Sequence, residues 1–391
     1  MPIPPDLGVR ETGPSDLGEE ERLLRASVRE FVAREIAGHL DEWERAGEVP
    51  RSLHEKAGEA GILGVGYPEE VGGSGGGVLH LMAVAEEIIQ AGGSSGLCAA
   101  LLTHGIAIPH LLAAGDREQI ERWVRPTLAG RKVGALAVTE PDAGSDVAAI
   151  RTRAARDGGH YVVNGAKTYI TSGARADFVT TAVRTGGPGR AGISLLVVEK
   201  GTPGFTVGRK LEKIGWCCSD TAELFFADAR VPAVNLVGAE GAGFRQILRQ
   251  FQSERLFLAA QAVATARRCC QLSVGWARQR EAFGGRLADK PVIRHKLAEM
   301  TRQTEVAGEY ARAVARRFAS GEEVSGEVAM AKNTATDACS FVVNEAVQIH
   351  GGLGCMRESE VERHYRDARI LAIGGGTREI MNEVIADRLG L

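Results

Sequence analysis

A long run without proline constrains the C-terminal part of this chain more than any other feature. Residues 243–283 contain no proline, and their apolar residues recur at helical spacing. A helix of that length buries its apolar face only against other elements, so we expect the chain to return along it. Residues 292–319 and 327–350 supply two more long helical segments. The pattern predicts a four-helix bundle domain over residues 238–391.

A change in periodicity divides the rest of the chain. Up to residue 131 the apolar pattern is helical, which predicts an N-terminal helical domain over residues 1–131 with residues 1–18 as a flexible tail. Residues 132–237 instead hold short β-rich runs separated by glycine-rich turns, which predicts a middle antiparallel, β-barrel-like domain. The β-rich runs are residues 133–139, 160–164, 167–171, 178–183, 193–198 and 223–226. The expected fold class is α+β, mostly α.

Composition excludes several classes of protein. The 391 residues carry a formal net charge of −3, so no basic surface for nucleic acid is expected. Residues 90–115 lack charged side chains, but they contain Pro109 and two histidines, which are costly in lipid, so we expect no membrane insertion. The seven cysteines include no C-x-x-C pair, and the polar N-terminus is not a signal peptide. Both features favour a cytoplasmic protein.

Common catalytic signatures are missing from the sequence. The nine histidines form no H-x-x-x-H pair, and none has a cysteine at ligand spacing, so no metal site is expected. The sequence also contains no G-x-S-x-G nucleophile motif, no phosphate-binding P-loop, and no dinucleotide-binding glycine motif after a strand. Nucleophilic, metal-dependent and Rossmann-type chemistry are therefore weak hypotheses.

The loop that follows the first β-rich run is the best local candidate for a ligand site. Residues 137–146 read AVTEPDAGSD, a strand end followed by a tight turn with hydroxyl groups at Thr139 and Ser145. Such a loop presents backbone N–H groups and hydroxyl donors to one ligand. A capped turn without a ligand would have the same composition, so this segment alone leaves both interpretations open.

This loop resembles the first signature of the acyl-CoA dehydrogenase family, and five further segments resemble that family in order. They are NGAKTYITSGARADF at 164–178, KIGWCCSDTAELFFADARVP at 213–232, QREAFG at 279–284, QIHGGLG at 348–354 and IGGGTREIM at 373–381. The resemblance covers residues 20–390. It implies FAD-dependent α,β-dehydrogenation of an acyl-CoA to trans-2-enoyl-CoA, as in fatty-acid or branched-chain acyl-CoA oxidation. The implied electron acceptor is an electron-transfer flavoprotein.

The resemblance divides the FAD site between two regions. Val138 and Thr139 resemble residues that bind the flavin, and Tyr169 stands where many members have a tryptophan over the flavin ring. Segments that match the adenosine and diphosphate contacts belong to a neighbouring subunit, so the resemblance implies a homotetramer built as a dimer of dimers. The residues implied for FAD are Leu136, Val138, Thr139, Gly144, Ser145, Tyr169, Ile170, Thr171, Arg280, Phe283, Gln348, Gly351, Gly352, Thr377 and Glu379.

The catalytic base departs from the pattern of many family members. They carry a glutamate in a C-terminal Y-E-G-T motif, but the corresponding position here is Gly375. Glu254 is an alternative, because it shares one helix face with Ile247, Phe251 and Leu258. Desolvation on an apolar face raises the pKa of a carboxyl toward that of a useful base. Considered by itself, such a glutamate is more often a salt-bridged or helix-edge residue than a base.

The resemblance favours Glu254 as the base. Residues 253–256 match the isovaleryl-CoA and long-chain acyl-CoA dehydrogenase branches, whose members have glycine at the C-terminal position and take their base from this glutamate. Gly375 retains a backbone N–H that resembles the family's donor to the thioester carbonyl, so Glu254 and Gly375 are the implied catalytic residues. The implied substrate-binding residues are Ser145, Ser253, Arg255 and Gly376.

Two other functions remain open on the sequence. A related flavin-dependent oxidase or monooxygenase would use O2 directly and would form peroxide without an added acceptor. A non-catalytic acyl-CoA or flavin-binding protein would explain the glycine at position 375, and bleaching of the flavin by substrate would exclude it. The acyl chain is not encoded in these motifs. The absence of side chains at residues 374–376 predicts room for long or branched chains.

Overall fold

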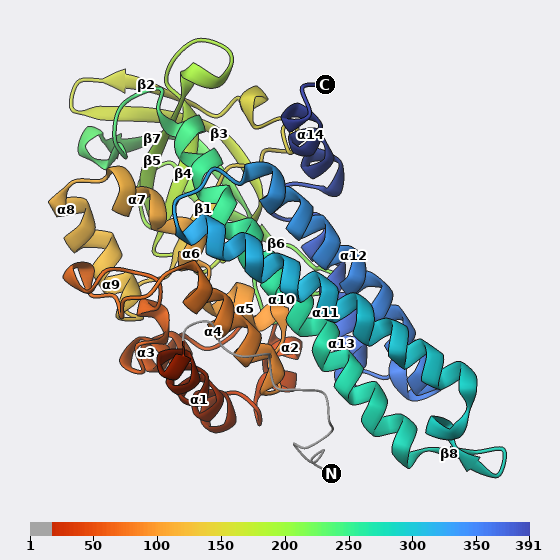
Figure 1. Cartoon of the computed structure of the whole chain (residues 1–391). Helices are drawn as coiled ribbons and strands as arrows, with labels where there is room; N and C mark the ends of the chain where they lie inside the picture. Colours follow the sequence, from red (N-terminus) through yellow and green to blue (C-terminus); the bar gives the residue numbers. More distant parts are fainter. Residues whose placement is uncertain (1–17) are drawn as a thin grey trace.

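The computed structural model describes residues 18–391, and Figure 1 shows helices at both ends of the chain around a β region. The expected fold class, α+β and mostly α, is confirmed. The tail expected over residues 1–18 lies outside the described residues except for Gly18, the first residue of α1. The N-terminal helices are α1 Gly18–Glu35, α2 Leu40–Ala46, α3 Arg51–Glu59, α4 Val78–Gln90, α5 Ser95–Leu101, α6 His104–Ala107, α7 Pro109–Ala114, α8 Arg117–Gln119 and α9 Arg125–Leu128.

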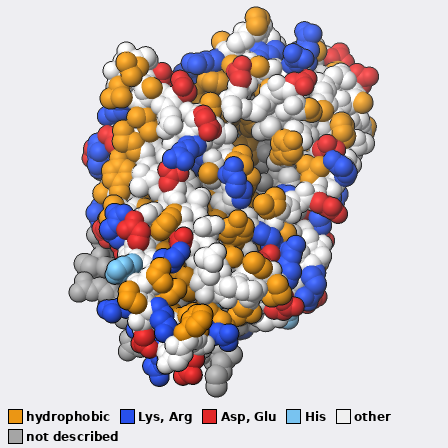
Figure 2. All heavy atoms as spheres, turned by 90° about the vertical axis from the view of Figure 1, so that its right-hand side faces the viewer, with side chains coloured by type: hydrophobic (Ala, Val, Ile, Leu, Met, Phe, Trp, Pro, Cys, Tyr) orange, Lys and Arg blue, Asp and Glu red, His pale blue; other side chains and the backbone are white. Residues whose placement is uncertain are grey.

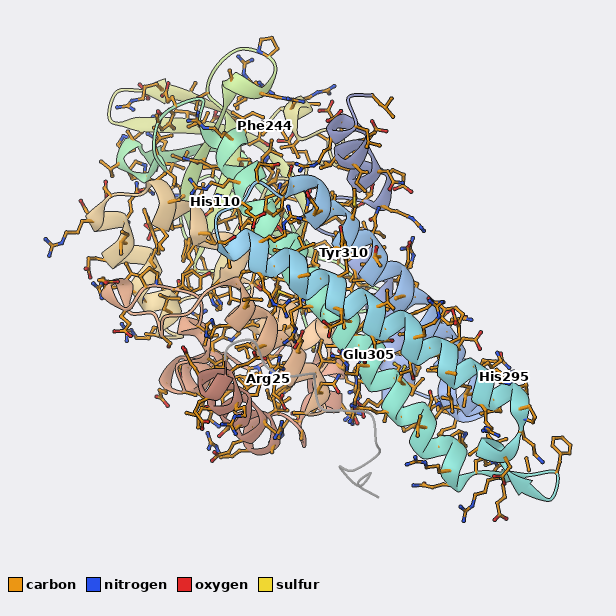
Figure 3. The ribbon with its side chains drawn as sticks, in the orientation of Figure 1. Arg25, His110, Phe244, His295, Glu305 and Tyr310 are labelled. Atoms are coloured by element: carbon orange, nitrogen blue, oxygen red, sulfur yellow. The ribbon has the colours of Figure 1, made fainter. Side chains whose placement is uncertain are left out.

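Helix α4 joins the N-terminal helices to the C-terminal ones. Its sequence is almost entirely apolar apart from Glu86 and Glu87, and both carboxylates are buried. A buried carboxylate needs a cationic partner, and Glu86 pairs with Arg25 of α1 at 2.6 Å and with Arg312 at 3.1 Å. Figure 3 shows Arg25 on α1, on the side of the molecule away from the sheet. These pairs link helices that are far apart in the sequence.

The uncharged segment at residues 90–115 forms α5, α6 and α7. Within residues 18–391 no single helix has the length and apolar composition needed to cross a membrane. One bent pair, Ser95–Leu101 with His104–Ala114, passes that test only when its two parts are joined across a 60° bend. Most of these helical residues are buried against the rest of the chain, which explains their apolar character.

The middle region is one mixed sheet. Its strands are β1 Gly134–Ala137, β2 Arg153–Asp157, β3 His160–Thr171, β4 Phe178–Arg184, β5 Ile193–Glu199, β6 Phe205–Lys210 and β7 Thr221–Pro232. The order is β1-β4-β2-β3-β7-β6, with β5 paired to β4. Most pairs are antiparallel as expected, but β1 runs parallel to β4, as does the single β2–β4 pair at Arg153 and Arg184.

Strands β4 and β5 pair with each other and are buried on both faces. Phe178 packs toward Trp123 and the N-terminal helices, while its neighbour Val179 packs into a second core with Val198. Successive residues of a strand point to opposite faces, so both cores draw on the same continuous apolar run. The sequence pattern missed β2 and β6 because both strands are largely exposed and lack such a run.

The C-terminal region is a helical bundle. It comprises α10 Gly243–Gln279, α11 Pro291–Ala319, α12 Ser325–His350, α13 Glu360–Leu371 and α14 Arg378–Arg388. Alanines and cysteines dominate the buried faces of α10 and α12, and small side chains allow helices to approach closely. Phe244 lies near the sheet end of α10 and His295 near the opposite end of the bundle (Figure 3).

The helix expected to continue to residue 283 ends instead at Gln279. A short hairpin follows, with strands β8 Glu281–Ala282 and β9 Gly285–Arg286. The two residues between these strands, Phe283 and Gly284, have φ values of 51° and 74°. Positive φ at both positions is the geometry of a two-residue type I′ turn, which an α-helix cannot accommodate. Figure 1 shows this hairpin projecting from the end of the bundle farthest from the sheet.

Candidate active site

Glu254 lies near the sheet end of α10, on the apolar face that its spacing predicts. Ile247 and Leu258 on the same face are buried, and Oε2 of Glu254 is a buried oxygen without a hydrogen-bond partner among the described residues. Burial raises the pKa of Glu254 to about 7, although the positive charges of Arg255 and Lys332 act in the opposite direction. At neutral pH this carboxyl is therefore poised to accept a proton.

A turn of three glycines, residues 374–376, lies opposite Glu254. Gly375 and Gly376 have φ values of 66° and 104°, a region that side chains other than glycine rarely adopt. A Cβ on Gly375 would lie 2.8 Å from Cδ1 of Leu258, closer than real Cβ atoms approach. The backbone conformation and Leu258 together explain why glycine stands where many family members have glutamate.

Two buried cations hold the carbonyl groups of this turn. Nε of Arg255 donates a hydrogen bond of 3.0 Å to the Gly375 carbonyl, and Nζ of Lys332 donates to the Gly376 carbonyl. The N–H of Gly375 has no acceptor among the described residues. The turn therefore offers a backbone N–H without an acceptor close to a buried carboxyl group. This pair of groups suits removal of a proton next to a carbonyl.

The loop that follows β1 is tied down by a buried ion pair. Nζ of Lys167 on β3 lies 2.8 Å from Oε1 of Glu140 and donates to the Val138 carbonyl at 2.9 Å. Glu140 also accepts hydrogen bonds from the N–H groups of Arg151 and Thr152. Burial alone would raise the pKa of Glu140, but Lys167 and these hydrogen bonds outweigh it and hold the pKa below its ordinary value. The loop is thus fixed relative to β3.

Tyr169 presents its ring to solvent beside this loop. Its side chain is 70% exposed, its φ is 59°, and it lies at a register shift between β3 and β7. The preceding strand residue, Thr168, donates its N–H to the Thr139 carbonyl at 3.0 Å, so Tyr169 and Thr139 are neighbours. An exposed aromatic ring held on a positive-φ backbone is suited to stacking on a planar ligand. A Cβ on Gly144 would also meet no atom within 4 Å, so the loop is open.

A second cluster lies at the other end of the bundle. The Arg280 guanidinium lies over the Trp276 ring at 5.9 Å, and Trp276 stacks on His350 at 5.5 Å. Gly351 follows His350 directly and Gln348 lies two residues before it, so this stack brings the two predicted adenosine-binding segments together. Phe283 in the adjoining hairpin is 98% exposed.

The two groups of predicted cofactor residues do not meet within one chain. From Glu254 to the end of α10 at Gln279 the helix rises about 38 Å at 1.5 Å per residue. The Arg280 cluster lies at the hairpin end of the bundle in Figure 1, whereas Tyr169 belongs to strand β3 and Thr139 to the loop that follows β1. One chain therefore carries half of a predicted FAD site at each of two distant places.

The remaining predicted site residues have simple placements. Leu136 is buried in β1, Ile170 is buried in β3, Thr171 ends β3, and Gly351 and Gly352 are exposed after α12.

Ser145 is exposed in the β1 loop, whereas the Ser253 hydroxyl donates to the Gln250 carbonyl of its own helix at 2.9 Å. Thr377 caps α14 by accepting from the Ile380 N–H, and Glu379 lies exposed in the first turn of that helix.

Lys332 and the Lys167–Glu140 pair were missed by sequence reasoning. A signal existed for Lys332, because it falls on the α12 face formed by Val328, Ala335 and Cys339, and all three neighbours are buried. A lysine on a buried face is as anomalous as the glutamate on α10. Within residues 18–391, no three His, Cys, Asp or Glu side chains are arranged to hold a metal ion.

The surface of the molecule is hollowed on one side. The side of Figure 1 that carries α14 faces the viewer in Figure 2, where the surface is hollowed above its middle. Hydrophobic side chains and side chains of both charges lie around the hollow.

Comparison with known proteins identifies the family. The acyl-CoA dehydrogenase N-terminal, middle and C-terminal domains match residues 18–131, 135–229 and 241–390 in turn. The chain belongs to the acyl-CoA dehydrogenase family. Members of this family are FAD-dependent enzymes that dehydrogenate acyl-CoA, and this chain is an enzyme of that type. Tyr169, the open Gly144 loop and the exposed Arg280 cluster fit such a cofactor.

Individual relatives align over nearly the whole chain. A crystal structure from Mycobacterium abscessus, described as a probable acyl CoA dehydrogenase, is 65% identical with a TM-score of 0.94 and covers 95% of this chain and 99% of that one. An acyl-CoA dehydrogenase from Geobacillus kaustophilus is 41% identical with a TM-score of 0.93, covering 97% and 100%. The mouse (Mus musculus) mitochondrial long-chain specific acyl-CoA dehydrogenase is 39% identical over 98% of this chain and 89% of its own length.

Proposed function

We propose that this protein converts an acyl-CoA to its trans-2-enoyl-CoA, with Glu254 as the base that removes the α-proton. One observation carries the proposal: the buried, unpartnered Oε2 of Glu254 lies on the helix that faces the Gly375 turn, where a backbone N–H also lacks an acceptor. A carboxyl whose pKa is about 7 accepts a proton readily near neutral pH. The N–H of Gly375 stabilises the negative charge that develops on the thioester carbonyl as that proton leaves.

Residues of the β1 loop and β3 would hold the flavin part of the cofactor. Val138 and Thr139 offer backbone groups at the strand end, and Tyr169 offers an exposed ring on which a planar group can stack. When bound, FAD supplies the acceptor for the hydride that leaves the β-carbon. The Lys167–Glu140 pair keeps the two flavin-contacting segments in register.

We further propose a dimer of dimers in which each FAD site is completed by a neighbouring chain. The separation of Tyr169 from the Arg280 cluster supports this assembly, since both are exposed and neither can reach the other within one chain. The Arg280 side chain suits a diphosphate because its guanidinium forms paired hydrogen bonds with phosphate oxygens.

Long or branched acyl chains are the substrates we propose. A Cβ on Gly374 would meet only the Ile370 carbonyl oxygen, at 3.6 Å, so the turn leaves space there. Leu258 occupies the corresponding space beside Gly375. The open side of the turn is therefore beside Gly374, and a substrate with a longer or bulkier acyl group can use it.

Anaerobic titration of the purified holoenzyme with acyl-CoAs from four to sixteen carbons, straight and branched, tests this function. We expect the flavin absorbance to bleach with longer or branched substrates and less with butyryl-CoA. A flavin that stays oxidised with every acyl-CoA would contradict dehydrogenation, and a profile that peaks at four carbons would contradict the substrate class. Electron transfer to an electron-transfer flavoprotein is the expected re-oxidation. Stoichiometric peroxide in air without that acceptor would assign an oxidase instead.

A further inference from the structure

Lys332 is a buried cation without an acidic partner in contact. Its side chain has 0% exposure, and no described carboxylate lies within ion-pair distance of Nζ. Val328 and Ala335 surround it on the apolar face of α12. Burying a lysine ammonium group without an anionic partner lowers the stability of the fold. A lysine that is kept at such a position is therefore a candidate for a functional role. A lysine placed for stability alone would be replaced at lower cost by an apolar residue.

The hydrogen bond that Lys332 donates indicates what this residue does. Its Nζ donates to the Gly376 carbonyl, directly after the carbonyl that Arg255 holds. The two cations come from different helices, Arg255 from α10 and Lys332 from α12. Together they fix two consecutive peptide groups of a turn that has positive φ at both residues. A glycine turn without such contacts has many accessible conformations.

We propose that Lys332 is a positioning residue that, with Arg255, holds the glycine turn so that the Gly375 N–H faces the substrate carbonyl beside Glu254. This inference rests on the proposed function, since the N–H matters only if a carbonyl binds there. Lys332 touches neither the substrate nor the base. It acts through the backbone of residues 375 and 376 and through its charge.

The charge of Lys332 also acts on the base. Among the described residues, the charges that act on the Glu254 carboxyl are those of Arg255, from its own helix, and Lys332, from α12; the turn, α13 and α14 add none. Both are positive, so both favour the charged carboxylate and limit the rise in pKa that burial causes. Removing the Lys332 charge should therefore raise the pKa of Glu254 further.

Two variants separate the hydrogen bond from the charge. Lys332→Gln removes the charge but keeps an N–H donor for the Gly376 carbonyl, whereas Lys332→Met removes both. Stopped-flow reduction of the holoenzyme by a saturating acyl-CoA, measured from pH 5 to pH 9, gives for each protein the pH at which the reduction rate is half-maximal (the midpoint) and the maximal rate (the plateau). Burial lowers the pKa of Lys332 itself to about 8, so Lys332 in the wild type still carries its charge at the pKa of about 7 of Glu254. We expect both variants to move the midpoint upward by about one pH unit. Only Lys332→Met should lower the plateau, by roughly tenfold or more.

Lys56→Met is the matched control, because Lys56 lies on α3 and pairs with Glu35 at 2.6 Å. Its pH profile should equal that of the wild type. An unchanged plateau in Lys332→Met would overturn the positioning role, even with a shifted midpoint. Loss of thermal stability in both Lys332 variants with wild-type profiles would assign a structural role only. If Lys332→Met does not fold, Lys332→Ala, which also lacks the N–H donor, takes its place: a lowered plateau with unchanged acyl-CoA affinity supports the role, and a wild-type plateau overturns it.

A measurement without turnover distinguishes failure of this inference from failure of the proposed function. Infrared difference spectra recorded across the same pH range detect the protonated Glu254 carboxyl as the band that Glu254→Gln removes. In Lys332→Gln this band should persist to higher pH than in the wild type, whether or not any acyl-CoA reduces the flavin. A band that titrates at the same pH in both proteins would overturn the electrostatic part of the inference.

Discussion

Gly375 and Glu254 face each other so closely that a Cβ on Gly375 would lie 3.5 Å from Oε1 of Glu254. A carboxylate on the turn and a carboxylate on α10 would thus occupy the same space. The α10 position supplies the carboxylate here, and the turn contributes only backbone. Because the helix is rigid and packed on both sides, the base is held by elements of secondary structure instead of by a loop.

Replacing Glu254 with glutamine should abolish most flavin reduction. The amide keeps the size of the carboxyl but cannot accept the α-proton, so we expect the reduction rate to fall by about 10²–10⁴-fold. Stopped-flow reduction measures the rate, and spectral titration measures retained acyl-CoA binding. Glu309→Gln, at an exposed position on α11, should leave both unchanged. Reduction of Glu254→Gln within a few-fold of the wild type would mean that the base lies elsewhere.

Moving the carboxylate onto the turn should rescue activity poorly. In Glu254→Gln/Gly375→Glu the new side chain meets Leu258 at 2.8 Å from its Cβ and must adopt a φ near 66°. A positive φ costs a non-glycine residue about 1–2 kcal/mol. Adding Leu258→Ala removes the steric conflict, so the triple variant should reduce the flavin roughly tenfold faster than the double variant. Equal rates in the two proteins would show that Leu258 is not the obstacle.

The stability of Glu254→Gln relative to the wild type should depend on pH. The folded-state pKa of Glu254 is about 7 against an ordinary value of 4.5, so the folded protein holds a proton that the unfolded chain has released. Wild-type stability contributed by this group therefore decreases between about pH 4.5 and pH 7 and stays lower above that range. Glutamine has no such dependence. Denaturant unfolding should show the variant more stable by on the order of 2 kcal/mol at pH 8 and by little at pH 4.5.

The same stability difference between variant and wild type at pH 8 and at pH 4.5 would contradict the buried, proton-binding state of Glu254. The comparison of two proteins at each pH cancels the other titrating groups, since they are shared. Both proteins should be measured as holoenzymes with equal FAD content, because a ligand that binds only the folded state adds stability of its own.

Replacing Arg280 with alanine should weaken FAD retention more than it weakens the fold. Arg280 is exposed and its ring contact with Trp276 is at the surface, so the thermal midpoint should change little. FAD affinity, measured by fluorescence on the apoprotein, should fall by at least tenfold if a phosphate contact is lost. Arg278→Ala, two residues away and also exposed, is the control. A fully flavinylated monomer in light scattering would contradict the shared site.

The long helices were predicted well because their apolar spacing repeats over many turns. The error at the end of α10 has a local cause: Arg280 leaves the helical region, and Phe283 and Gly284 form a turn. Gly284 and Gly285 are the residues in the sequence that indicate this turn. The exposed strands β2 and β6 gave no apolar alternation to detect. Register shifts such as the one at Tyr169 depend on pairing with β7, which lies far along the chain.

The candidate site, like the fold, could be predicted only in part from the sequence. Glu254 was predicted from its own helix, because a carboxylate on an apolar face is visible in the sequence. The contacts of Lys332 and Arg255 with the glycine turn are different, since they join residues 332 and 376, or 255 and 375, through backbone carbonyl groups. Every residue has such a carbonyl, so no residue type marks the partner. Only the folded arrangement of α10, α12 and the turn identifies it.

The length of α10 limits which insertions this protein can tolerate. Glu254 lies on one part of a helix that ends at Gln279, just before Arg280. Insertion of a single residue between them would rotate the hairpin by about 100° around the helix axis and shift it by about 1.5 Å. Both α11 and α12 pack along α10, so their buried faces would lose register as well. Loops can accept single insertions, but this helix tolerates change only in steps close to whole turns, matched in its two neighbours.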